Sequence, residues 1–139
     1  MIPGNIRDQL IRDEGVKLTA YKDIVGKTTI GVGRNLDDVG ISLSEANLLL
    51  DTDICRATEA LLLALPWVST LTEARRGVLI NMAFNLGIKG LLGFTNTLGL
   101  IKSGKYLEAS VEMLKSKWAA QVGERAVRLS DQMATGIWH

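Results

Sequence analysis

Carboxylic acids are the groups best suited to chemistry in this sequence. The chain has one histidine, His139, and one cysteine, Cys55. A Ser-His or Cys-His pair for nucleophilic catalysis, or a zinc site of His and Cys ligands, therefore has almost no candidates. The stretch RDEGVKLTAYKDIVGKTTIGVGRN contains the two acids best placed for such chemistry, Glu14 and Asp23. A pair of carboxylates can supply a general acid and a general base, and we expect neither a metal nor a cofactor.

Glu14 is predicted to lie in the last turn of a helix that Asn5 caps and Gly15 ends. Leu10 and Ile11 precede it by one helical turn, so the carboxyl should share their apolar face. The helix dipole places partial negative charge at this end. Both effects favour the protonated form of the acid. The alternative, from these residues alone, is a frayed glutamate in water.

A β-hairpin should follow this helix. The residues Val16–Asp23 favour a first strand, Ile24–Lys27 a turn, and Thr28–Gly33 a second strand. Alternation along the second strand would place Thr29 on the same side as two glycines, Gly31 and Gly33. Glycines on one face of a strand weaken it unless something must approach the backbone closely.

The remaining residues predict helices, which makes the fold class α+β and mostly α. Ser42 and Glu45 form a capping-box pattern before a long helix that runs to about Leu65, and Pro66 ends it. Helical spacing then recurs in five segments: Glu73–Leu86, Lys89–Gly93, Asn96–Ser103, Tyr106–Trp118 and Glu124–Ala134. The length of 139 residues suits a single domain.

Charge and hydropathy limit the partners. The net charge is +1, which gives no general indication of nucleic-acid binding, although residues 66–139 are the more basic part. Four arginines there, Arg75, Arg76, Arg125 and Arg128, keep a helical nucleic-acid binder as an alternative. No apolar run approaches the ~20 residues that span a bilayer, and the first residues do not resemble a signal peptide.

The motifs, taken together, resemble one family. The pattern Glu14-Gly15, then Tyr21-Lys22-Asp23, then Thr29-Ile30-Gly31-Val32-Gly33 is similar to the active-site segment of the phage-type lysozymes, glycoside hydrolase family 24, also called endolysins or muramidases. The later segments Glu73–Leu98, Lys115–Trp118 and Arg125–Arg128 resemble the central and C-terminal helices of the same family.

This resemblance implies a lysozyme-like fold in two lobes. Residues 15–42 would form a small β lobe, residues 43–65 a linking helix, and residues 66–139 with 1–14 a helical lobe. The implied reaction is hydrolysis of the β-1,4 bond between N-acetylmuramic acid and N-acetylglucosamine in peptidoglycan. Glu14 would be the general acid, and Asp23 with Thr29 would hold and activate the attacking water, with inversion. Phe84 and Thr97 would line the saccharide cleft.

The sequence departs from the family pattern at Arg34, where the better-known members have a histidine. We expect Arg34 to pair with Asp23 or Glu14, or to be solvated. A catalytically weak peptidoglycan-binding or tail-associated domain on the same fold remains an alternative, as does a transglycosylase. The resemblance further implies a monomer that binds glycan strands, with no nucleic acid and no membrane insertion. It would be made in the host cytoplasm and reach the cell wall after holin-type release.

Overall fold

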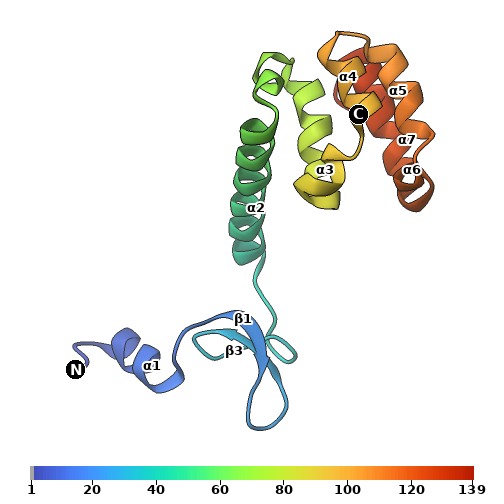
Figure 1. Ribbon diagram of the computed structural model, residues 1–139. Helices are drawn as coiled ribbons and strands as arrows, with labels where there is room; N and C mark the ends of the chain where they lie inside the picture. The colour runs from blue at the N-terminus through green and yellow to red at the C-terminus, as the bar shows by residue number, and fades with distance from the viewer. Residues whose placement is uncertain (1) are drawn as a thin grey trace. The chain divides into compact units, whose positions relative to one another are not determined.

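A computed structural model describes residues 2–139 of the chain (Figure 1). The described residues form seven α-helices, a short 3₁₀ helix and one three-stranded antiparallel sheet, which confirms the predicted α+β, mostly helical fold class. The residues up to Leu49 form one compact unit, and Leu50–His139 form a second one. We call them the N-terminal unit and the helical unit. The predicted grouping of residues 1–14 with the helical lobe stays a prediction.

The N-terminal unit begins with helix α1, Ile6–Glu14, as the capping residues predicted. The backbone N–H of Asp8 donates to the side chain of Asn5 over 2.8 Å. At the other end, Gly15 has a φ of 73° and its N–H donates to the carbonyl of Ile11. A positive φ carries no penalty for glycine, so the helix stops at Glu14.

The sheet has three strands rather than the two that were predicted. Its order is β1 (Lys17–Lys22), β2 (Thr28–Gly31), β3 (Arg34–Asn35). The prediction of one strand through Gly33 is wrong because Gly31 and Gly33 have φ values of 71° and 70°, which regular strands do not adopt. These two glycines turn the chain back, so that β3 pairs with β2 in antiparallel register.

Helix α2, Leu43–Ala64, starts as its sequence predicted. The N–H of Glu45 donates to the hydroxyl of Ser42 over 3.1 Å, and the N–H of Ser42 donates to the carboxylate of Glu45 over 2.9 Å. Each side chain thus satisfies a backbone donor that the first helical turn leaves without a partner. The helix ends before Pro66, which opens the short 3₁₀ helix η1, Pro66–Thr70.

The helical unit contains α3 (Glu73–Leu92), α4 (Thr95–Lys102), α5 (Tyr106–Leu114), α6 (Lys117–Val122) and α7 (Glu124–Thr135). Its core is built from apolar side chains that these helices share with the end of α2 and with η1. The largest fully buried ones are Leu61, Val68, Val78, Leu79, Met82, Leu91, Ile101, Met113 and Met133. Burial of this apolar surface is the main favourable term in folding the unit.

A glycine and a serine set two helix boundaries in the helical unit. Gly87, predicted as a helix stop, has φ 76° and ψ 160°, so it breaks the regular geometry inside α3. The predicted single helix Tyr106–Trp118 is wrong, because α5 ends at Leu114 and α6 begins at Lys117. The hydroxyl of Ser116 accepts from the N–H of Ala119 over 3.1 Å, so this serine caps a new helix.

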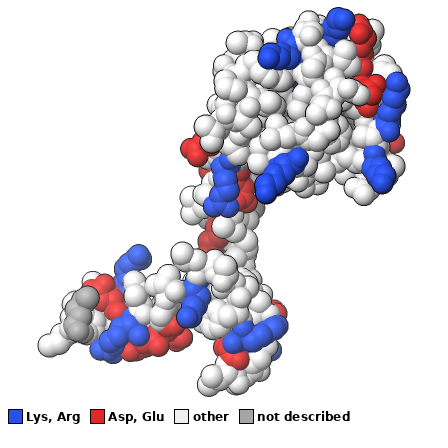
Figure 2. Space-filling view, in the orientation of Figure 1, with Lys and Arg blue, Asp and Glu red and all other residues white. Residues whose placement is uncertain are grey.

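Two of the four arginines of the nucleic-acid alternative are bound internally. Arg75 donates to the carbonyls of Met133 and Ala134 over 2.8 and 3.0 Å, and its guanidinium lies 3.8 Å above the ring of Tyr106. Arg125 donates twice to the side chain of Asn81. On the face in Figure 2, the basic side chains of the helical unit are separated by uncharged and acidic residues. These features do not favour a continuous phosphate-binding surface.

Within residues 2–139 no single helix is both long and apolar enough to cross a membrane. The one pair that passes on length and composition, α3 with α4, bends by 104° at the break between them.

Gly77 in α3 allows Trp138 to pack on the helical unit, and this contact can be tested. A Cβ atom on Gly77 would lie 2.5 Å from the Trp138 indole, whereas a Cβ atom on Gly99 in α4 would meet nothing within 4 Å. Alanine gains helix propensity at Gly77 too, but it must push aside the exposed Trp138 ring, so Gly77→Ala should be less stable than Gly99→Ala by about 1 kcal/mol. Gly99→Ala should gain up to about 1 kcal/mol from helix propensity. Urea unfolding measures both, and equal stability of the two variants would contradict this packing.

Candidate functional site

The carboxyl of Glu14 lies against the backbone of Gly33, at the turn between β2 and β3. A Cβ atom on Gly33 would lie 3.0 Å from both Cδ and Oε2 of Glu14. Gly33 therefore has two reasons to be glycine, its positive φ and its contact with the acid. Close approach to the backbone was one possible reason for the glycines on this segment, and the structure identifies the approaching group as Glu14.

Asp23 follows β1 directly and organises the hairpin turn. Its Oδ1 accepts hydrogen bonds from the N–H groups of Val25 and Lys27 over 3.0 and 2.9 Å. Its own N–H donates to the carbonyl of Lys27 over 2.9 Å. No hydrogen bond from the described residues reaches Oδ2. One carboxylate oxygen thus fixes the turn, while the other keeps its capacity to accept.

The structural part that Asp23 plays in the turn was not predicted. Its signal was present in the sequence, because an aspartate two to four residues before turn N–H groups often bonds to them, and Gly26 completes such a turn.

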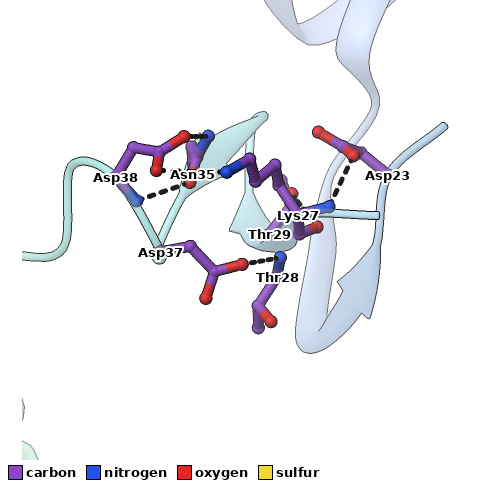
Figure 3. A network of polar contacts seen from close by, with 7 residues as sticks. All are labelled: Asp23, Lys27, Thr28, Thr29, Asn35, Asp37 and Asp38. Atoms are coloured by element: carbon purple, nitrogen blue, oxygen red, sulfur yellow. Dashed lines mark hydrogen bonds and ion pairs between the residues drawn. The ribbon is translucent and has the colours of Figure 1, made fainter. Parts of the chain in front are cut away.

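Thr29 is 3% exposed and lies in the middle strand of the sheet. It pairs with Tyr21 of β1 and with Asn35 of β3. Its hydroxyl donates to the carbonyl of Lys27 over 2.9 Å. Lys27 thus bonds to Asp23 through its N–H (Figure 3) and to Thr29 through its carbonyl. The structure brings these two predicted site residues together through one residue of the backbone.

A second set of acids, not predicted from the sequence, binds the following loop to the hairpin. Asp37 accepts from the N–H of Thr28 over 2.8 Å, and this hydrogen bond lowers the pKa of Asp37. Asp38 binds the ammonium of Lys27 at 3.3 Å and the side chain of Asn35 at 3.0 Å (Figure 3). These contacts hold the loop after β3 against the same turn that contains Asp23.

Arg34 pairs with neither Asp23 nor Glu14, so this expectation is wrong. Its guanidinium makes two contacts of 2.8 Å with the carboxylate of Glu45, one to each oxygen. It also donates to the carbonyl of Gly40 over 3.1 Å. The physical reason is geometric: Glu45 offers both oxygens to the planar guanidinium at the start of α2, and paired parallel hydrogen bonds of this kind are strong.

Phe84 and Thr97, the predicted saccharide-binding residues, lie in separate pockets of the helical unit. Phe84 is 47% exposed and lines a pocket of about 390 Å³ between α2 and α3. Thr97 is buried and lines a pocket of about 190 Å³ that also contains Asn96, Lys115 and Ser116. The two residues are therefore not brought into one cavity of this unit.

Comparison with protein families gives a direct match. The model of the phage lysozyme family matches residues 12–132 of the chain. The chain belongs to the phage lysozyme family. The matched range includes Glu14, Asp23 and Thr29 as well as Phe84 and Thr97, whose individual roles stay predictions.

Relatives of this chain include proteins with different names. A "Probable T4-type lysozyme 1" of Dictyostelium discoideum is 33% identical over an alignment that covers 95% of each chain. An "Endolysin" of Acyrthosiphon pisum secondary endosymbiont phage 1 is 31% identical and covers 82% of this chain and 78% of its own. A "Pre-baseplate central spike protein Gp5" of Enterobacteria phage T4 is 26% identical over 95% of this chain but only 28% of its own length. The family and the names of the lysozyme and endolysin relatives support a lysozyme-type glycosidase.

The contact between Glu14 and Gly33 generates a prediction with a matched control. Alanine at Gly33 or at Gly104 would adopt a positive φ in either case, and each should cost about 1–2 kcal/mol of stability. Only at Gly33 would the new Cβ also push against the Glu14 carboxyl, since Gly104, between α4 and α5, has nothing within 4 Å. Gly33→Ala should therefore lower activity on peptidoglycan by about tenfold or more through displacement of the acid.

The measurement compares the release of reducing ends by Gly33→Ala and Gly104→Ala at matched folded concentration. Equal activities of the two variants would mean that the Gly33 contact does not place the acid.

Proposed function

We propose that this member of the phage lysozyme family is an endolysin that hydrolyses the β-1,4 bond between N-acetylmuramic acid and N-acetylglucosamine in bacterial peptidoglycan. Such hydrolysis needs a protonated acid on the leaving oxygen and a second carboxylate that faces the sugar from the other side. The observation that carries the proposal is the match to the phage lysozyme family over the segment that holds Glu14, Asp23 and Thr29.

Glu14 is proposed as the general acid. Its carboxyl is exposed on the N-terminal unit, at the end of α1, and no ion pair within residues 2–139 involves it. The nearby cation of the sequence, Arg34, is bound to Glu45 instead. With no cation of residues 2–139 bound to it, the Glu14 carboxyl is free to contact the glycosidic oxygen, to which the proposed general acid must transfer a proton.

Asp23 and Thr29 are proposed to hold the attacking water. The Thr29 hydroxyl uses its proton on the carbonyl of Lys27, so its oxygen can accept a hydrogen bond from water. The Oδ2 of Asp23 can accept the second one, because Oδ1 is the oxygen that binds the turn. A water that donates both protons directs a lone pair at the anomeric carbon.

The proposed hydrolysis is a single displacement at the anomeric carbon. The water oxygen bonds to the anomeric carbon as the glycosidic bond breaks, Asp23 takes a proton from the water, and Glu14 gives its proton to the leaving oxygen. Attack from the face opposite the leaving group inverts the configuration at the anomeric carbon.

Phe84 and Thr97 are proposed to contact the glycan. Phe84 contributes an exposed aromatic ring at the edge of its pocket, which can pack against the apolar face of a sugar ring. Thr97 contributes a hydroxyl to a more polar pocket with Asn96 and Ser116.

The proposed biological role is lysis of the host cell. The protein would be made in the host cytoplasm and reach the cell wall after holin-type release, where it acts as a monomer. The relative named "Endolysin" supports this role.

A second candidate is a tail-associated domain that binds peptidoglycan with weak catalysis. The similarity to the central spike protein favours it, because that relative is named as a part of a phage particle. A protein of this kind would bind purified peptidoglycan without rapid release of reducing ends.

Glu14→Gln tests the proposed acid. The amide has the same shape and cannot donate the proton, so we expect release of reducing ends from purified peptidoglycan to fall by about 10²-fold or more. The control is Glu108→Gln, which changes an exposed glutamate in α5. Parental activity in Glu14→Gln would remove the assigned role, and anhydro-sugar products of the parent would indicate a transglycosylase.

Asp23→Asn distinguishes the structural role of Asp23 in the turn from its proposed role as the general base. The amide oxygen of asparagine can accept both turn hydrogen bonds, so the free energy of unfolding should stay near that of the parent. Hydrolysis should be lost, because the amide is no base. Asp23→Ala should lose both hydrogen bonds as well, at a cost of about 1–3 kcal/mol. An active Asp23→Asn variant would limit Asp23 to its structural part in the turn.

A further inference from the structure

The turn that faces Glu14 has little to hold it in place by itself. It contains Gly31 and Gly33, both at positive φ, and glycine has more conformational freedom than any other residue. The strand that follows, β3, has only two residues, and these make two register pairs with β2. Such a short pairing is a weak anchor, so the position of Gly33 must depend on other contacts.

The residue after Gly33 supplies that anchor. Arg34 binds both oxygens of Glu45 at 2.8 Å and the carbonyl of Gly40 at 3.1 Å. Two parallel contacts to a planar guanidinium fix direction as well as distance. The side chain of Arg34 thus ties the end of the glycine turn to the chain before α2 and to α2 itself.

Glu45 is in turn held from the other side. Its Oε1 accepts from the N–H of Ser42 over 2.9 Å, and its N–H donates to the Ser42 hydroxyl. Its hydrogen bond with Arg34 and those with Ser42 lower the pKa of Glu45 to about 2. The partner of Arg34 is therefore a fixed carboxylate that stays ionised near neutral pH.

The Arg34–Glu45 ion pair contributes little to the free energy of folding, because it is exposed to solvent. The side chains of Arg34 and Glu45 are 37% and 39% exposed, and ion pairs with this exposure are strongly screened by water. The paired geometry of Arg34 and Glu45 is therefore better explained by the segment that the pair holds in place. That segment, next to Arg34 in the chain, is the glycine turn in contact with Glu14.

We propose that the Arg34–Glu45 ion pair positions Glu14, by fixing the Gly31–Gly33 turn against which the acid lies. Arg34 is a positioning residue, since its contacts are with Glu45 and Gly40 rather than with the acid. The pair and the turn all belong to the N-terminal unit. The inference rests on the proposed role of Glu14 as the general acid. It adds a role for Arg34, which stands where the better-known members have a histidine.

The test uses the full chain with Arg34→Ala, Arg34→Lys and Glu45→Gln. Arg128→Ala is the matched control, because it removes another exposed arginine, in α7. Steady-state kinetics on soluble peptidoglycan glycan fragments give kcat and KM separately. For Arg34→Ala we expect kcat to fall about tenfold with KM nearly unchanged, because the acid is misplaced while the glycan still binds. Arg34→Lys keeps the charge without the paired contacts and should lie between parent and Arg34→Ala.

A second readout does not depend on catalysis. In ¹H–¹⁵N spectra without substrate, the Gly33 amide should shift and exchange faster in Arg34→Ala and Glu45→Gln, but not in Arg128→Ala. A parental kcat in Arg34→Ala, a change confined to KM, or an unchanged Gly33 amide would each overturn the inference. An inactive parent would contradict the proposed function instead, and the Gly33 amide would still decide whether Arg34 holds the turn. If Arg34→Ala does not fold, Arg34→Lys and Glu45→Gln give the same two readouts.

Discussion

The left-handed backbone of Gly31 and Gly33 is the constraint on which the candidate site depends. A chain that continued as a regular strand past Gly31 would carry Arg34 away from Glu45 and would leave no third strand to pair with Thr29. The reversal brings the backbone of Gly33 to the carboxyl of Glu14. A side chain at Gly33 would oppose both the turn and the contact, so one residue type meets two requirements at once.

Local signals in the sequence were sufficient to predict the helices of the N-terminal unit and the first part of its sheet. Asn5, Gly15, Ser42 and Glu45 act within one helical turn of their partners, and the structure has the bonds that these residues predicted. The third strand was missed because a Gly-Val-Gly sequence is compatible both with a weak strand and with a turn. The choice between them depends on contacts with Glu14 and Glu45, which alternation along the strand does not encode.

The site was predictable as a set of residues but less so as an arrangement. The motif spacing indicated Glu14, Asp23 and Thr29, while the turn hydrogen bonds of Asp23 and the shared partner Lys27 became clear only from the structure. The partner of Arg34 could not be predicted, because the N-terminal unit has several carboxylates and the bidentate geometry that selects Glu45 depends on where α2 begins. In the helical unit, the break at Ser116 was missed because apolar spacing continues across it.

The hydrogen bonds of Arg75 have a consequence for how the helical unit folds. They join α3 to the end of α7 across a sequence separation of 58 residues, and Met133 of α7 is fully buried beside them. Contacts of such long range require the closure of a large loop before they contribute any stabilisation, which slows folding. The helical unit therefore cannot close its core during synthesis until α7 has left the ribosome. A ribosome-bound chain that still lacks this helix would expose apolar surface to chaperones and proteases.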